Sequence, residues 1–452
     1  MTRRIAPVFI VLCTVVVAFG AARAYAQEVS NVHLLQEIRQ LKQTVAEQAQ
    51  RIGELEDRMG SKQKPAARAA ATAEVPEELS EQIDKHLNAR IPAYKAFEGL
   101  DFTGWVTTIG QYARNANGAD MLSRTEDATD ASYTAHIILD KKFGDYGWGL
   151  VHFQGGNGVG VTDELQLFSN VNYDATDTDS NASITEAWYE HYFEPWELSL
   201  TVGKLDAFSY IDTNEYAYDQ ALQFLGNMFC NSPVIEFPTD SGEAAVRLAW
   251  EPTEKLVIDV LAMDSNADGE DIFDALFLAT QLNFKPALFG RSGNYRLIFW
   301  QNNAGHTTWM DTTEDKENGL GWGVSFDQEF TDCLGGFFRY GWQDPDVYLN
   351  GESVSLYQSY SFGPQIKGAL WGRKEDVVGI GFGQAVPSKK YKEANGLIAK
   401  TESHLECYYA FKANEHFTIS PDLQVIWRPY GKDAANGDGT IVVSGLRGQL
   451  DF

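Results

Sequence analysis

The 452-residue sequence has few basic residues and few cysteines. Its 36 lysines and arginines are outnumbered by 63 aspartates and glutamates, which gives a formal net charge of −27 at pH 7. Phosphate backbones and anionic headgroups repel so acidic a chain, so we expect no nucleic acid partner and no docking on an anionic membrane surface. After the N-terminal region the cysteines are scattered and odd in number, which excludes a disulfide framework.

Long apolar runs and catalytic motifs are also lacking. Beyond the N-terminus, no segment approaches the roughly 18 apolar residues of a membrane helix. The sequence contains no HExxH, GxSxG or P-loop motif, and its eight histidines show no metal-ligand spacing. We therefore predict neither an enzyme nor a bound cofactor. Glycine (40 residues) and aromatic residues (13%) are both abundant, which favours a membrane β-barrel over a soluble exported protein.

The first 26 residues have the form of a signal peptide. Arg3 and Arg4 precede a mostly apolar stretch over residues 5–20, and residues 24–26 form an A-x-A cleavage site. We therefore expect export from the cytoplasm. Residues 1–26 hold three arginines and no acids, so their removal takes the net charge from −27 to −30.

Residues 27–60 carry a heptad pattern. Apolar residues recur three and four positions apart, at Leu34, Ile38, Leu41, Val45, Ile52, Leu55 and Met59. This spacing predicts a short parallel coiled coil, and therefore an oligomer. A lone amphipathic helix packed on its own domain would give the same pattern. Residues 61–98 follow as a linker rich in Ala, Lys and Pro, with a possible short helix near its end.

From residue 99 to 452 the sequence predicts an all-β transmembrane barrel of about 16 antiparallel strands. Segments of about ten residues alternate apolar and polar positions, and short and long connections alternate between them. This order is typical of an outer-membrane barrel, with short periplasmic turns and long outer loops. An even strand number also brings both barrel ends to the periplasm, on the side of the coiled coil. The predicted strands are 101–114, 131–143, 147–156, 184–194, 197–204, 242–251, 255–264, 276–285, 293–302, 320–330, 334–343, 356–368, 375–385, 402–413, 417–428 and 440–452.

The alternation assigns side chains to the lipid or to the lumen. In the last predicted strand, one face carries Val442, Leu446, Leu450 and Phe452. The other face carries Val443, Arg447, Gln449 and Asp451. The terminal phenylalanine resembles the signature that barrel-assembly machinery reads. A lipid-facing charge near the midplane would cost about 2–4 kcal/mol. We therefore expect arginines at polar positions to line an aqueous pore, chiefly Arg247, Arg296 and Arg339.

The segment 205–241 is the longest connection and is both acidic and aromatic. Counting from a periplasmic N-terminus, it is the third outer loop. Its first part, up to residue 229, contains four carboxylates, Asp206, Asp212, Glu215 and Asp219, and six aromatic residues between 208 and 229. A loop in solvent does not need so many aromatic side chains. We therefore predict that the loop folds into the barrel and narrows it.

The stretch GKLDAFSYIDTNEYAYDQALQFLGNMF (203–229) resembles the signature segment of carbohydrate-selective porins, the OprB family. ITEAWYEHYF (184–193) and ISPDLQVIWRPYG (419–431) resemble two further strands of that family, and the resemblance covers roughly residues 100–452. The sequence departs from the family pattern at Tyr218 and Gly226, where asparagine is usual. The resemblance implies a passive outer-membrane channel that favours sugars such as glucose. The coiled coil lies outside the family core and resembles periplasmic extensions that anchor porins or stiffen their trimers.

Sugar hydroxyls pair with carboxylates and arginines, and sugar C–H faces stack on aromatic rings. We therefore expect a constriction between the loop and the opposite wall arginines. Its predicted residues are Asp206, Asp212, Glu215, Asp219, Tyr216, Tyr218, Arg247, Arg296 and Arg339. Arg114 and Arg428 are weaker candidates at a rim. Residues 212–214 could instead cap the loop's own backbone, and Asp206 or Lys204 could hold the loop in an internal salt bridge.

Residues 264–271, DSNADGED, resemble the start of a calcium-binding EF-hand loop through Asp264, Asn266 and Asp268. The acid required at the twelfth position is replaced by Ala275. An ordinary acidic outer loop is therefore the better interpretation, with loose Ca²⁺ or Mg²⁺ binding beside lipopolysaccharide as the alternative. Residues 174–181 are similar.

The sequence thus predicts an outer-membrane sugar porin with a periplasmic coiled coil. We expect a homo-oligomer, and specifically a trimer. Its predicted partners are small sugars, outer-membrane lipid, lipopolysaccharide and, through the coiled coil, peptidoglycan. Three alternatives remain open. They are a non-specific or cation-preferring porin, a structural barrel that tethers the envelope, and a secreted β-rich carbohydrate-binding protein or glycosidase.

Overall fold

The computed structural model describes residues 99–118, 126–176, 178–238, 242–266, 274–288, 290–311, 317–350 and 355–452. The predicted signal peptide, coiled coil and linker lie outside these residues and stay predictions. Within the described part of the chain, no helix combines the length and apolar character needed to cross a membrane.

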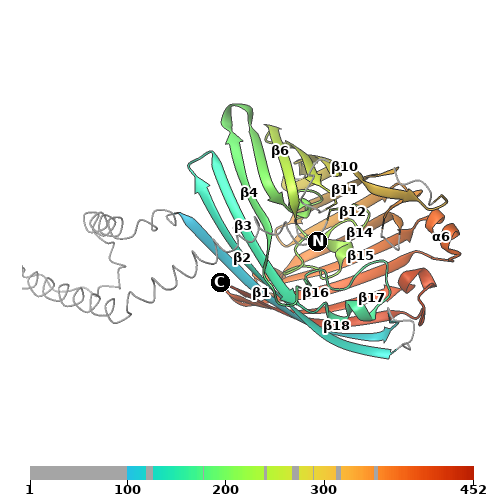
Figure 1. The fold of residues 1–452 in the computed structure, drawn as a ribbon. Helices are drawn as coiled ribbons and strands as arrows, with labels where there is room; N and C mark the ends of the chain where they lie inside the picture. Colours follow the sequence, from blue (N-terminus) through green and yellow to red (C-terminus); the bar gives the residue numbers. More distant parts are fainter. Residues whose placement is uncertain are drawn as a thin grey trace, which may run out of the picture. The chain divides into compact units, whose positions relative to one another are not determined.

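The described residues form a closed antiparallel barrel. Its sixteen long strands are β1(Leu100–Ala116), β2(Glu126–Phe143), β3(Gly147–Asn157), β4(Ser183–Phe193), β5(Leu198–Leu205), β6(Glu243–Thr253), β7(Leu256–Asp264), β8(Leu276–Phe284), β10(Arg291–Thr308), β11(Glu317–Thr331), β12(Leu334–Gln343), β14(Leu356–Lys367), β15(Val377–Pro387), β16(Glu402–Asn414), β17(Phe417–Trp427) and β18(Ile441–Asp451). Strand β1 pairs with both β2 and β18, which closes the sheet (Figure 1). The predicted barrel and strand number are confirmed, and each predicted strand overlaps one of these sixteen.

Shorter elements join the long strands. They are β9(Ala287–Leu288), β13(Val347–Leu349), the helices α5(Asn227–Cys230) and α6(Lys389–Asn395), and the 3-10 helices η1(Gly160–Glu164), η2(Glu194–Trp196), η3(Ala207–Ser209), η4(Gly368–Trp371) and η5(Pro429–Lys432). All of the short helices lie in the connections between long strands. The long strands themselves alternate their side chains between the two faces of the wall.

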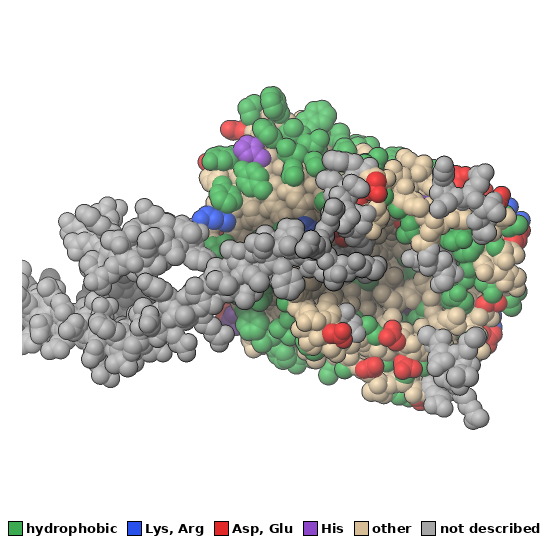
Figure 2. Space-filling model, in the orientation of Figure 1, with side chains coloured by type: hydrophobic (Ala, Val, Ile, Leu, Met, Phe, Trp, Pro, Cys, Tyr) green, Lys and Arg blue, Asp and Glu red, His purple; other side chains and the backbone are tan. Residues whose placement is uncertain are grey.

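The two faces of the wall differ as the alternation predicted. In β12, Phe338 is 41% exposed on the outer face, while its neighbour Arg339 is 1% exposed on the lumen side. Aromatic side chains gather outside near the short turns, as in the interfacial girdles of membrane barrels. Examples are Phe102, Phe143, Tyr189, Trp196, Trp250, Phe330, Trp371 and Phe452. Figure 2 shows apolar side chains over the barrel wall and acidic groups gathered toward the end that carries α6.

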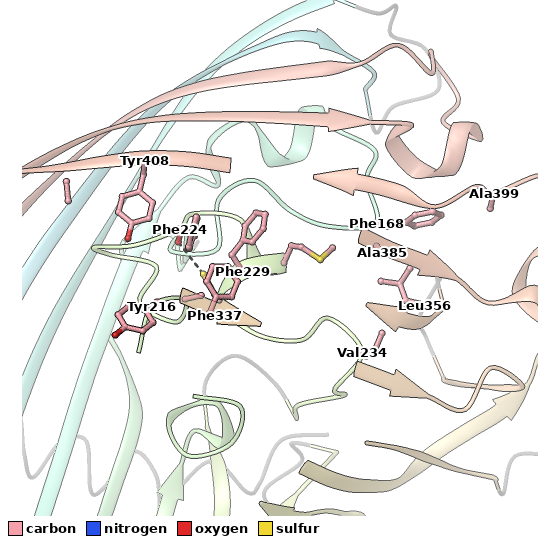
Figure 3. Close-up of a cluster of buried hydrophobic side chains, with 14 of the residues drawn as sticks. Phe168, Tyr216, Phe224, Phe229, Val234, Phe337, Leu356, Ala385, Ala399 and Tyr408 are labelled. Carbon is pink, nitrogen blue, oxygen red and sulfur yellow. Dashed lines mark hydrogen bonds between the residues drawn. The ribbon is translucent and has the colours of Figure 1, made fainter. Parts of the chain in front are cut away.

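Two long loops fold inward and pack in the lumen, and their described parts are residues 158–176 with 178–182 and residues 206–238. The third loop, predicted to do so, buries Phe224, Phe229 and Met228 almost completely. Figure 3 shows Phe224 and Phe229 facing the wall residues Phe337 and Tyr408. The ring centroid of Phe224 lies 5.0 Å from that of Tyr408 and 5.6 Å from that of Phe337. The inward fold of the second loop was not predicted.

Glycines on the lumen face of β15 make room for the third loop. A Cβ atom added to Gly381 would lie 2.7 Å from the Phe229 ring, and one added to Gly383 would lie 2.5 Å from Met228. The same holds for Gly335 of β12, where a Cβ would meet the Tyr216 ring at 2.1 Å. Contacts so close exclude larger side chains without movement of the loop. The wall and the loop are therefore complementary in shape.

Candidate pore constriction

The third loop is fixed to the barrel wall by a buried ion pair. Nε of Arg339, on β12, donates to Oδ1 of Asp212 at 2.8 Å, and both side chains are about 1% exposed. The second carboxylate oxygen of Asp212 accepts the backbone N–H of Ser232 at 2.6 Å. Asp212 has a positive φ of 64°, a conformation that aspartate tolerates better than most residues. The pair thus joins two turns of the loop to the wall.

The two terminal guanidinium nitrogens of Arg339 bind loop backbone. They donate to the carbonyl oxygens of Asp212, Ala217, Phe229 and Cys230 at 2.8–3.3 Å. All three nitrogens of the Arg339 guanidinium therefore bond the loop. The prediction had Arg339 and Asp212 on opposite sides of an open pore, whereas in the structure they bond each other directly. Their contacts match the alternative in which Asp212 holds the loop's own backbone.

Three further charged wall residues hold loop backbone, and sequence reasoning did not single them out for this. Glu406 accepts the N–H groups of Leu225 and Gly226 at 2.5 and 2.9 Å. Arg447 donates to the carbonyls of Gln220 and Gln223. Glu402 holds the second loop, through the N–H groups of Phe168 and Ser169 and the Ser169 hydroxyl. The available signal was the row of polar residues at alternate positions 402, 404 and 406 of β16.

Most of the loop's predicted solute ligands serve the loop itself. Asp206 accepts the N–H of Phe208 at 3.0 Å, and Asp219 accepts those of Ala221 and Leu222 at 2.8 and 3.0 Å. Burial raises the pKa of the Asp219 carboxyl, while these two N–H groups favour its charged form.

The two predicted loop tyrosines also pack within the protein. Tyr218 stacks on Phe208 with centroids 4.6 Å apart, and Tyr216 is 8% exposed. Burial and the nearby acids raise the pKa of Tyr216 to about 12.

Glu215 is the predicted loop carboxylate that is exposed. Its backbone N–H donates to Oδ2 of Asp327 on β11 at 3.3 Å. The same Asp327 oxygen accepts from Arg296 of β10 at 2.6 Å. Within the described chain, Nε of Arg296 has no hydrogen-bond partner. Burial and the Asp327 carboxylate raise the pKa of Glu215. The Glu215 backbone and the Arg296 guanidinium thus share one Asp327 carboxylate oxygen, and the role of both residues as solute ligands stays a prediction.

The third predicted wall arginine, Arg247, lies in a separate cluster. Its guanidinium bonds Oδ1 of Asp259 at 2.5 Å and Oε2 of Glu190 at 3.3 Å. The guanidinium carbon also lies 4.5 Å from the ring centroid of Tyr210, which comes from the third loop. Arg247 is thus neutralised by wall acids and covered by a loop aromatic ring. The weaker candidates Arg114 and Arg428 are both exposed.

An aromatic row on the lumen face of β1–β4 was missed by sequence reasoning. Trp105 stacks on His136 at 4.4 Å and 10°, and His136 lies 3.0 Å from His152 between ring nitrogens. His152 approaches Glu186 at 3.7 Å, and Trp188 donates to the same carboxylate at 3.1 Å. Alternation would have placed these residues inside, but it could not show that they touch, because the contacts cross four strands.

The weak calcium candidates are only partly described. Asp264 ends β7 with 1% exposure, and neither of its carboxylate oxygens has a partner among the described atoms. Asn266 donates to Asp274 at 3.0 Å. Asp268 lies outside the described residues. The described residues contain no group of three or more ligand side chains placed to hold a metal ion.

With the barrel and its inward loop established, comparison with known proteins decides the family. The family model for the carbohydrate-selective porin, OprB family, matches residues 151–452. The chain belongs to this family of outer-membrane porins. Porin AaxA of Chlamydia pneumoniae is 22% identical over 318 residues, which cover 68% of this chain and 67% of AaxA. The structure of Pseudomonas putida OprB at high pH has a TM-score of 0.67 at 18% identity, covering 81% of this chain and 97% of OprB. That likeness supports the porin fold.

Proposed function

We propose that this OprB-family porin admits neutral, glucose-like sugars through a lumen in which charges are largely paired. The observation that carries the proposal is the pairing of the three wall arginines with acids. Arg247 bonds Asp259 and Glu190, Arg296 bonds Asp327, and Arg339 bonds Asp212. A lumen with compensated charge and many hydrogen-bonding groups suits a neutral polyol better than an ion.

The surfaces that remain open to solute suit a sugar. Glu215 is exposed and Arg247 is partly exposed, so they offer acceptors and donors for hydroxyl groups. Tyr210 and Trp188 are also partly exposed and offer aromatic faces for C–H groups. Because the solute must also leave, the individual contacts have to be weak. We assign Asp206, Asp212, Asp219, Tyr216, Tyr218 and Arg339 to holding the loop that shapes this passage.

We also propose a homotrimer with residues 27–60 as a coiled coil in the periplasm, where it could contact peptidoglycan. The heptad spacing supports an oligomer, and the closed even-stranded barrel supports periplasmic ends. Outer-membrane lipid and lipopolysaccharide would surround the apolar outer wall. The competing function is a cation-preferring porin, which the net charge of −27 favours to the extent that acids line the pore.

The test is single-channel conductance of the purified full-length protein in a planar bilayer, with and without glucose and across a salt gradient. Reversible glucose block with weak ion selectivity is the expected result. Steady conductance without glucose block and with strong cation preference would replace the sugar porin by an acidic general porin. A protein without any conductance would favour the tethering role instead.

A further inference from the structure

A second cavity opens in the lumen at the short-turn end of β2–β6, away from the constriction. Its volume is about 570 Å³, within the range of about 300–1,000 Å³ that small-molecule sites occupy. It is lined mainly by Lys142, Trp148, Glu190, Tyr192, Glu197 and Glu251. No residue of the loop 205–241 lines it. It is therefore a separate place along the path of a solute.

The pairing of the strands puts these side chains on the lumen side. Trp148 is directly opposite Lys142 on one neighbouring strand and Glu190 on the other. Glu190 in turn bonds Arg247, which lies on the lumen face of β6. Residues directly opposite in antiparallel strands share a face. The row Lys142, Trp148 and Glu190 thus leads from the cavity toward the arginine cluster of the pore.

Trp148 presents a ring with a fixed orientation. It is 38% exposed, although it lies on the inner side of the wall. Its indole Nε1 donates to Asp140 Oδ2 at 3.0 Å. Its ring lies 5.1 Å from that of Trp188, at 87° between the ring planes. A ring that neighbours already hold loses little freedom when a ligand stacks on it.

The polar groups around Trp148 can bond several hydroxyls at once. Glu190 and Glu251 offer carboxylate oxygens, Ser199 a hydroxyl and Lys142 an ammonium group. Tyr192 is engaged with Glu197 through a 2.5 Å hydrogen bond. The lining of the cavity contains one lysine, and its acidic residues outnumber it; they are Asp145, Glu190, Glu197 and Glu251. The local field therefore repels anionic solutes but not neutral ones.

We propose that this cavity is a saccharide subsite at the periplasmic exit of the pore, where a neutral sugar stacks on Trp148 and its hydroxyls bond Glu190, Glu251 and Lys142. The inference rests on the proposed sugar transport and adds a second binding step to it. It also assigns the cavity a selectivity, because a sugar that carries a carboxylate meets like charge there.

The test compares Trp148→Ala with the wild-type full-length protein in planar bilayers, with glucose added to one side and then to the other. Loss of a stacked ring should slow glucose association from the short-turn side by about two- to tenfold and leave association from the long-loop side unchanged. Trp148→Phe should restore most of the rate. Trp322→Ala is the matched control, because Trp322 is equally exposed, at 38%, on the lipid-facing side of β11.

The two hypotheses fail differently. Wild-type protein that glucose never blocks would refute sugar transport itself. Glucose block with equal kinetics in wild type and Trp148→Ala would refute the exit subsite alone. Glu251→Gln gives a second, milder test that preserves side-chain size. It should raise the association rate of glucuronate relative to glucose about twofold at low salt, and an unchanged ratio would contradict the proposed selectivity.

Discussion

Arg339 and Asp212 lie 127 positions apart in the sequence and form one buried ion pair between the barrel wall and the third loop, with Nε and Oδ1 2.8 Å apart. Together with the contacts of Glu406 and Arg447, the pair holds the loop inside the lumen. Both side chains are about 1% exposed, so solvent offers little compensation if one partner is lost. The width of the passage therefore depends on a contact that solute never touches.

Arg339→Leu should release the loop. Removing one partner of a buried pair costs about 3–5 kcal/mol, because the remaining charge is left uncompensated. We expect a larger and noisier single-channel conductance, and weaker glucose block. Asp212→Asn combined with Arg339→Leu should recover part of the lost thermal stability, because asparagine removes the uncompensated charge and tolerates the positive φ at this position. A single variant with wild-type conductance and noise would contradict the anchoring role.

Gly381→Ala tests the fit between wall and loop by steric overlap alone. Its new Cβ would lie 2.7 Å from the Phe229 ring, so the loop has to shift. We expect altered conductance and a lower melting temperature in detergent. Gly110→Ala is the control, since a Cβ there meets nothing within 4 Å. Equal effects of the two substitutions would show that close packing at Gly381 is unimportant.

Arg247→Gln should make the pore prefer cations. The change leaves Glu190 and Asp259 without their shared positive partner. The reversal potential across a salt gradient should move in the direction of cation selectivity, and more so at low ionic strength. Lys389→Gln, which removes a charge from a side chain that is 81% exposed on α6, should move it much less. An unchanged reversal potential in Arg247→Gln would place Arg247 outside the conducting path.

Asp174 gives the second loop a pH dependence. Burial raises the pKa of its carboxyl to about 7, and Arg447 opposes the rise. The folded loop therefore holds the proton more tightly than the unfolded chain, so its contribution to stability is fully present below about pH 4 and is lost as the pH rises through 7. Asp174→Asn should lessen the drop in melting temperature between pH 5 and pH 8. An identical drop in both proteins would contradict this assignment.

The barrel could be predicted from sequence because lipid imposes a simple rule on every strand. Alternation put Arg247, Arg296 and Arg339 inside, and the structure agrees. The composition of residues 205–241 likewise indicated an inward loop. In both cases the information lies within one segment of the chain.

The partners of these residues could not be predicted. The contact between Arg339 and Asp212, or between Glu406 and the N–H groups of Leu225 and Gly226, depends on where a loop lies against distant strands. Periodicity carries no information about such placement. The second loop escaped prediction for the same reason, since it is held by Glu402 and by Asn227 of the third loop, which bonds Asn170.

Because the wall glycines leave room only for the side chains of this loop, the third loop and the wall strands beneath it have to change together. On β15, Gly381 lies against the rings of Phe229 and Phe224, and Gly383 lies against Met228, and all three of these side chains come from the loop. A loop grafted from another porin would meet a groove shaped for different side chains. Wall strands grafted from another porin, without glycine at these positions, would clash with the loop of this protein. Changing the solute preference of such a channel therefore requires exchange of β12, β15 and the loop together.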